Sequence, residues 1–227
     1  RDMSAHLQRE IGKLKKQVLS LSAVVEETVY RAVKSLRERD AALATFVIEA
    51  DSQIDQAEVD VEEECQKLLA LYQPVAHDLR LIIAVLKINA ELERIGDAAV
   101  NIAERVLFLV GEEQIDVPFD FMGMAKKAQN MLHRGIDAFV NLDTRTAHEV
   151  IRADDEVDAI TREMYGQVEE CIKKEPGLVG SYIHLLGIAR HIERIADNAS
   201  NIAEDVVYLI DGRIIRHRNE DYSLPDA

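Results

Sequence analysis

The sequence is poor in residues that interrupt regular structure, and this shortage favours long helices. Its ten glycines and four prolines make up about 6% of the 227 residues, roughly half of the ~12% found in an average protein. Tryptophan is absent, and aromatic residues reach only 5%. Hydrophobic residues still amount to 48%, which is enough for a sizeable core and too many for an intrinsically disordered chain. The length allows one large domain or two of about half the size.

Long apolar segments and cysteine clusters are also missing. The longest uninterrupted apolar run covers only residues 81–86, far short of the ~18 residues that indicate a membrane span. Residues 1–16 mix charges of both signs and contain no apolar signal region, so we expect a cytoplasmic protein. Cys65 and Cys171 lie far apart within helical patterns, which favours thiols over a disulfide framework.

Basic residues are outnumbered, and several motifs of catalysis are absent. Lys and Arg total 27 against 42 Asp and Glu, a formal net charge of −15. Such a charge repels phosphate backbones and argues against a nucleic-acid partner. The glycines form neither a dinucleotide-binding loop nor a P-loop. None of the seven histidines follows a glutamate at the spacing used by ferritin-like di-iron bundles.

Apolar residues recur at intervals of three and four between these sparse breakers, which is the spacing of an amphipathic helix. The clearest seam runs from Val85 to Leu109, and Ala99 lies within it. Such stripes are covered when neighbouring helices pack as an antiparallel bundle. We expect six helices, at residues 4–39, 41–72, 76–110, 120–142, 144–174 and 179–211.

A three-helix pattern occurs twice in the chain. Residues 93–106 match residues 193–206 at an offset of one hundred, with ten of fourteen positions identical. A weaker match joins 47–55 to 150–158 at an offset of 103. The segment Gly111–Gly123 breaks the pattern between the copies, and we interpret it as a linker. The sequence therefore predicts an all-α fold of two tandem three-helix bundles related by internal duplication. The predicted domains are residues 1–112 and, with a short C-terminal tail, residues 118–227.

The third helix of each half carries a polar row almost opposite its apolar seam. An ordinary solvated helix face tolerates nearly any polar residue. The second copy nevertheless keeps the same four residue types at the same spacing, although surface neighbours such as Arg105 and Asp205 have diverged. We infer that function constrains this row. Its members are Glu93, Asp97, Asn101 and Glu104 in the first half and Glu193, Asp197, Asn201 and Glu204 in the second.

The second helix of each half adds two aspartates one helical turn apart, a spacing at which like charges cost stability. These pairs are Asp51 with Asp55 and Asp154 with Asp158. If the second and third helices are antiparallel neighbours, each half brings four carboxylates to one patch. Oxygen ligands without thiolates suit magnesium, calcium, manganese or iron, and such a cation would offset the repulsion. We therefore expect a metal site on each half; the alternative is two acidic patches that attract only diffuse counterions.

The repeated motif Glu-Arg-Ile-(Gly/Ala)-Asp-x-Ala-x-Asn-Ile-Ala-Glu resembles the signature of the PhoU family. In the first half it follows Gln-Pro-Val-Ala-His-Asp-Leu-Arg at residues 73–80 and Leu-Lys-Ile at 86–88. The resemblance covers nearly the whole chain and implies two three-helix bundles with surface metal clusters. It assigns Asp51, Asp55, Glu93 and Asp97 to one cluster and Asp154, Asp158, Glu193 and Asp197 to the other, with Asn101, Glu104, Asn201 and Glu204 as further contributors.

Two departures from the family pattern bear on these sites. Asn198 stands where many members have histidine, and Glu58 and Glu62 of the first half become Thr161 and Tyr165 in the second. The two sites are therefore expected to differ in nuclearity or affinity. The metal itself stays open among iron, zinc, manganese, magnesium and calcium.

The resemblance implies regulation by contact rather than catalysis. It predicts a negative regulator of the phosphate-starvation response that links the ATPase subunit of the phosphate-specific ABC transporter to a membrane sensor histidine kinase. The protein would be a homodimer and would reach the membrane only through these partners. Two other classes stay open: a carboxylate-bridged metal-dependent hydrolase or oxygenase, which needs an open cavity with a general base, and a helical spacer that binds no metal.

Overall fold

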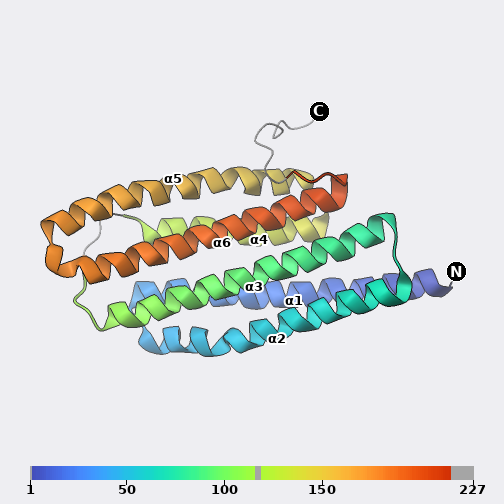
Figure 1. Ribbon diagram of the computed structural model, residues 1–227, viewed down its shortest axis with the longest axis horizontal. Helices are drawn as coiled ribbons and strands as arrows, with labels where there is room; N and C mark the ends of the chain where they lie inside the picture. The colour runs from blue at the N-terminus through green and yellow to red at the C-terminus, as the bar shows by residue number, and fades with distance from the viewer. Residues whose placement is uncertain (1, 116–118, 216–227) are drawn as a thin grey trace.

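The computed structural model describes residues 2–115 and 119–215, and within these ranges the chain is helical without a β-strand (Figure 1). Six α-helices occur where the sequence predicts them, with bounds that agree to within two residues. Pro118 and the predicted tail after residue 215 lie outside the described residues. The helices are α1 (Asp2–Glu38), α2 (Ala41–Tyr72), α3 (Ala76–Val110), α4 (Phe121–Asn141), α5 (Thr144–Lys174) and α6 (Val179–Asp211), with a short 3-10 helix at Pro176–Leu178.

Aspartate side chains cap the N-termini of three of the helices. Asp40 is the N-cap of α2 and accepts a hydrogen bond from the backbone N–H of Leu43 at 2.9 Å. Asp120 and Asp143 cap α4 and α5 in the same manner. These bonds satisfy backbone donors that have no partner within the first turn of a helix. Short polar residues at the breaks therefore fix where these three helices begin.

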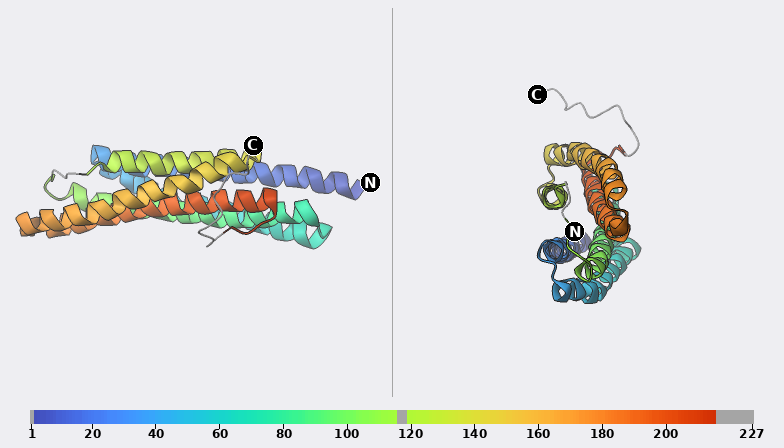
Figure 2. Two further views of the ribbon diagram at one scale, coloured as in Figure 1. Left: turned by 90° about the horizontal axis from the view of Figure 1, so that it is seen from above. Right: turned by 90° about the vertical axis from the view of Figure 1, so that its left-hand side faces the viewer.

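The two halves lie side by side, with α3 antiparallel to α6 at the centre of the molecule (Figure 1). Helices α1 and α2 pack on α3, and α4 and α5 pack on α6. A view along the helices shows the six as a curved double layer in which α1 also meets α4 (Figure 2). The sequence prediction of tandem bundles is confirmed, and the second and third helices of each half are antiparallel neighbours, as the metal hypothesis requires.

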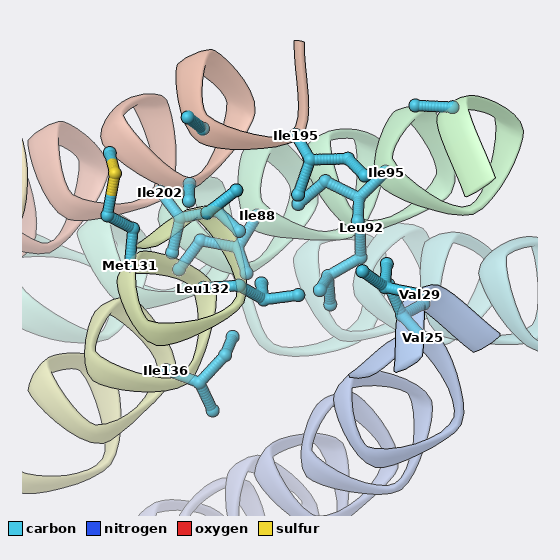
Figure 3. Close-up of a cluster of buried hydrophobic side chains, with 14 of the residues drawn as sticks. Val25, Val29, Ile88, Leu92, Ile95, Met131, Leu132, Ile136, Ile195 and Ile202 are labelled. Atoms are coloured by element: carbon cyan, nitrogen blue, oxygen red, sulfur yellow. The ribbon is translucent and has the colours of Figure 1, made fainter. Parts of the chain in front are cut away.

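One hydrophobic core runs through both halves. Leu92 of α3, Leu132 of α4 and Ile195 of α6 converge in its middle (Figure 3). Ala99 and Ala199 are fully buried on their helices, which confirms that the seam lies where the spacing placed it. Each half thus completes its neighbour's core.

The two cysteines and the hydropathy of the helices complete the description of the fold. Cys65 and Cys171 are both free thiols, and burial raises the pKa of Cys65 to about 12. Among the described residues, no helix is both long enough and apolar enough to cross a membrane.

Candidate metal centre

Three aspartates of the second half meet between α5 and α6. Asp154 and Asp158 lie one turn apart on α5, and Asp197 faces them from the antiparallel α6. One carboxylate oxygen from each lies within 4.8 Å of the other two. We call these three residues the aspartate triad. The predicted convergence of the two helices' carboxylates is therefore present in this half.

Burial and mutual repulsion make the triad electrostatically unfavourable on its own. Burial, followed by the charges of Asp197 and Asp158, raises the pKa of Asp154 to about 7. The Oδ1 atom of Asp154 is buried and accepts no hydrogen bond. Burial also raises the pKa of Asp197, with Asp158 as the next cause. Unsatisfied buried oxygens of this kind cost free energy unless a proton or a cation compensates them.

The donor set fits a hard cation. The triad offers carboxylate oxygens and no thiolate or imidazole. Carboxylate oxygens are the ligands that magnesium, calcium and manganese prefer. Glu193 lies one turn before Asp197, and its pKa is raised by burial and then by Asp197 and Asp158. It therefore belongs to the same acidic patch, at the edge of the triad. The orphaned oxygen of Asp154 is the position at which a bound ion would do most to relieve the penalty.

The first half gathers the corresponding side chains in a looser arrangement. Burial, then Asp55 and Asp97, raises the pKa of Asp51, whose Oδ1 atom is also buried without a hydrogen bond. Burial and Asp97 likewise raise the pKa of Glu93. Among the residues that the structure describes, however, no three ligand atoms of this half come as close as those of the triad. The four predicted carboxylates thus share a patch without forming a compact cage.

Two residues that were not assigned to a site join this first patch. Glu58 of α2 contributes to the raised pKa of Glu93, and its own pKa is raised by burial and by Glu62 and Asp55. Asn89 of α3 is buried and donates to Glu58 Oε1 at 3.0 Å. Asn89 lies four residues before Glu93, so extending the polar row by one turn identifies it from sequence. The second half does not repeat this pair: Thr161 stands at the position equivalent to Glu58, and Ala189 at the position equivalent to Asn89.

The remaining predicted contributors lie away from the triad or have other partners. Asn101 donates to the backbone carbonyl of Asp97 at 2.7 Å. Asn201 donates to Glu91 Oε2 on α3 at 3.2 Å and so joins the two halves. Glu104 is exposed and Glu204 is partly exposed. A ligand role for these four stays a prediction, as does metal binding by the closer carboxylates.

Fold and site together define a class of protein: a duplicated three-helix bundle with matched carboxylate pairs on the second and third helices of each copy. The sequence model described as the PhoU domain matches the chain twice, at residues 18–106 and 121–206. The chain belongs to the PhoU family. It is 37% identical over 211 residues to the phosphate-specific transport system accessory protein PhoU homolog of Aquifex aeolicus, covering 93% of this chain and 96% of that protein.

Solved structures agree with this assignment. The crystal structure of PhoU from Pseudomonas aeruginosa superposes with a TM-score of 0.87 at 34% identity, over 91% of this chain and 99% of that one. The phosphate transport system regulatory protein PhoU from Streptococcus pneumoniae gives a TM-score of 0.83 at 30% identity, over 92% and 98% of the two chains. PhoU is a family of accessory and regulatory proteins, not of enzymes, which argues against the metal-dependent hydrolase or oxygenase that the sequence left open.

Proposed function

We propose that the protein regulates phosphate uptake by contact with the phosphate-specific transporter. The observation that carries this proposal is full-length similarity: relatives named as accessory or regulatory proteins of phosphate transport match more than nine-tenths of this chain and of their own lengths. The whole two-bundle unit is therefore shared, rather than one module of a larger assembly. A regulator of this kind would act in the cytoplasm.

The proposed partners are the ATPase subunit of the transporter and a membrane sensor histidine kinase. By joining the two, the protein would repress the phosphate-starvation response when phosphate is plentiful. Long helices offer extended rigid faces for such contacts, and a net charge of −15 steers the protein towards basic surfaces. We further propose that it acts as a homodimer.

The aspartate triad would hold a divalent cation that sets the charge of this surface. The three carboxylates repel one another in the metal-free protein, and this repulsion contributes to the raised pKa values of Asp154 and Asp197. A bound cation would be attracted to all three and would offset the repulsion. The looser patch of the first half would bind more weakly. Of the candidate ions, manganese, magnesium and calcium match the oxygen donors best, while iron and zinc stay within the range of the ligand set.

Capture of partners with and without metal tests this function. The tagged protein is mixed with the purified ATPase subunit and with the cytoplasmic part of the kinase, in manganese or in chelator. We expect both to be captured, and the Asp158→Asn variant to behave in manganese as the wild type does in chelator. Asp155→Asn removes the same charge from an exposed neighbouring position and serves as the control. Failure of both partners to bind in either condition would overturn the proposal.

A further inference from the structure

A basic surface pocket lies between α3 and α6, next to the acidic patch of the second half. Its volume is about 480 Å³. Arg105 reaches it from α3, and Arg190 and Arg194 reach it from α6. Asp197 and Glu193 form its acidic edge. A concentration of three guanidinium groups is unexpected on a chain whose net charge is −15.

Glu193 and Asp197 at the edge of this pocket feel the charges of Arg190 and Arg194 without pairing with them directly. Within residues 2–115 and 119–215, the guanidinium groups of Arg105, Arg190 and Arg194 form neither a salt bridge nor a hydrogen bond. His191 lies among them with only 9% of its surface exposed, and its Nδ1 atom is buried without a hydrogen-bond partner. Burial, then Arg105, Arg194 and Arg190, lowers the pKa of His191 to about 4. The pocket thus combines three guanidinium groups that have no hydrogen-bond partner among the described residues with an unsatisfied buried polar atom.

Gly187 allows one of the arginines to enter the pocket from the other half. A Cβ atom on Gly187 would lie 2.3 Å from Cζ of Arg105 and 2.4 Å from its Nη1. Glycine in the interior of a helix costs stability relative to alanine, so its presence needs a reason. Here the missing side chain leaves the space that the Arg105 guanidinium occupies beside α6. The arrangement is therefore built by residues from both bundles.

The internal duplication supplies a comparison within the same molecule. At the equivalent place in the first half, Lys87 Nζ lies 3.1 Å from Asp205 Oδ1, and Arg94 Nη1 lies 2.9 Å from Glu91 Oε1. Those positive charges are balanced by carboxylates. At the positions one hundred residues later, Gly187, Arg190 and His191 stand in place of Lys87, Ala90 and Glu91. From the opposite half, Arg105 takes the place of Asp205, which lies one hundred residues after it. The pocket of the second half therefore lacks both of these carboxylates, shares one arginine with its counterpart (Arg194 for Arg94) and adds two more, Arg105 and Arg190.

We propose that this pocket binds a tetrahedral oxyanion of the phosphate class. Guanidinium groups present planar pairs of N–H donors that match phosphate oxygens and keep their charge at all relevant pH values. An anion of this size would supply the acceptors that the three arginines lack. The inference concerns the arginines alone and holds whether or not the triad binds metal; a cation on Asp197 would add further attraction to the same anion.

Isothermal titration with inorganic phosphate tests the proposal, with chelator present so that metal cannot contribute to the signal. We expect saturable binding to the wild type and at least about tenfold weaker binding to Arg105→Gln and Arg190→Gln, because each loses charge-assisted hydrogen bonds. Arg94→Gln removes the same charge at the position equivalent to Arg194 and should keep wild-type affinity. Thermal melts of all four proteins establish that each is folded.

A glycine pair gives a second, independent measurement. Gly187→Ala should displace the Arg105 guanidinium and weaken phosphate binding, whereas Gly166→Ala, whose added Cβ meets nothing within 4 Å, should not. ATP titrated in parallel distinguishes the source of the oxyanion: tighter binding than phosphate assigns the site to a nucleotide phosphate, and equal or weaker binding assigns it to free phosphate. No saturable binding of either ligand to the wild type, or equal loss in Arg94→Gln and Arg105→Gln, would overturn the proposal.

Discussion

Lys87 of α3 and Asp205 of α6 form a salt bridge across the two halves of the molecule, with Nζ 3.1 Å from Oδ1. The Asp205 side chain is only 2% exposed, and the Lys87 ammonium also lies 4.7 Å from the centre of the Tyr208 ring. A carboxylate this deeply buried needs compensation for the water it has lost. The contact therefore holds the bundles together only as long as both charges are present.

Replacing Lys87 should destabilise the fold more than an ordinary surface substitution. Lys87→Met keeps most of the side chain's volume and removes its charge, which leaves Asp205 with less compensation and should cost about 2 to 5 kcal/mol. Lys13→Met is the control, since Lys13 pairs with Glu10 on the surface and such pairs contribute about 1 kcal/mol or less. Urea denaturation measures both changes. Equal losses would show that the buried contact contributes no more than a surface pair.

The helices were predictable because local signals determine them. Spacing by three and four identifies the buried stripe, and Asp40 provides a helix start that depends only on nearby residues. Contact between the halves was not predictable in this way. The apolar stripe on α3 shows that another helix must cover it, but not which helix does so. Glu91 would be taken for a surface residue from the sequence, yet it is only 3% exposed.

Part of the candidate site followed from sequence for the same reason. Aspartates four residues apart share a helix face, so Asp154 and Asp158 could be paired without a structure. The register between two helices is a property of tertiary packing, and it decides that the second half forms a close triad while the first does not. It also brings Glu58 and Asn89 together across α2 and α3. The role of Gly187 likewise appears only when α3 is seen to cross it.

Enlarging the small residues of the central seam should overpack the core. Ala99 and Ala199 are both 0% exposed, so a leucine at either position has no free volume to occupy. We expect Ala99→Leu and Ala199→Leu each to lower the free energy of unfolding by about 1 to 3 kcal/mol. Ala159→Leu on the exposed face of α5 should change it by less than about 0.5 kcal/mol. A thermal melt in which all three variants match the wild type would contradict the seam assignment.

Removing one aspartate from either half should show how much metal each of the two proposed sites binds. Asp197→Ala breaks the close triad and should lower the manganese content by about one site's share, while Asp97→Ala should remove only the weaker binding of the first half. Both proteins should stay fully helical, because neither side chain fills the core and the bundle has a large hydrophobic core of its own. Elemental analysis measures the metal content, and circular dichroism measures the helicity. Equal metal content in the wild type and both variants would reduce these patches to solvated acidic faces.

Asp154 should make the stability of the metal-free protein fall as pH rises. Its pKa is about 7 in the folded protein against 3.8 as the ordinary value, so between these values the folded state holds a proton that the unfolded state has released. Stability then decreases with pH: the contribution of neutral Asp154 is complete below pH 3.8 and is lost as the pH rises through about 7.

Thermal melts in chelator at a series of pH values across this window test that sign. We expect Asp154→Asn to show a flatter profile and a higher melting temperature than the wild type at the alkaline end, because the variant has no charge to bury. Other carboxylates with raised pKa values, such as Asp197, keep some of the slope in both proteins. Asp60→Asn, which changes an exposed residue of the first half, should retain the wild-type profile. Saturating manganese should restore the melting temperature of the wild type at high pH, because the ion binds the ionised carboxylates. Parallel profiles for the wild type and Asp154→Asn would show that Asp154 is not the group responsible.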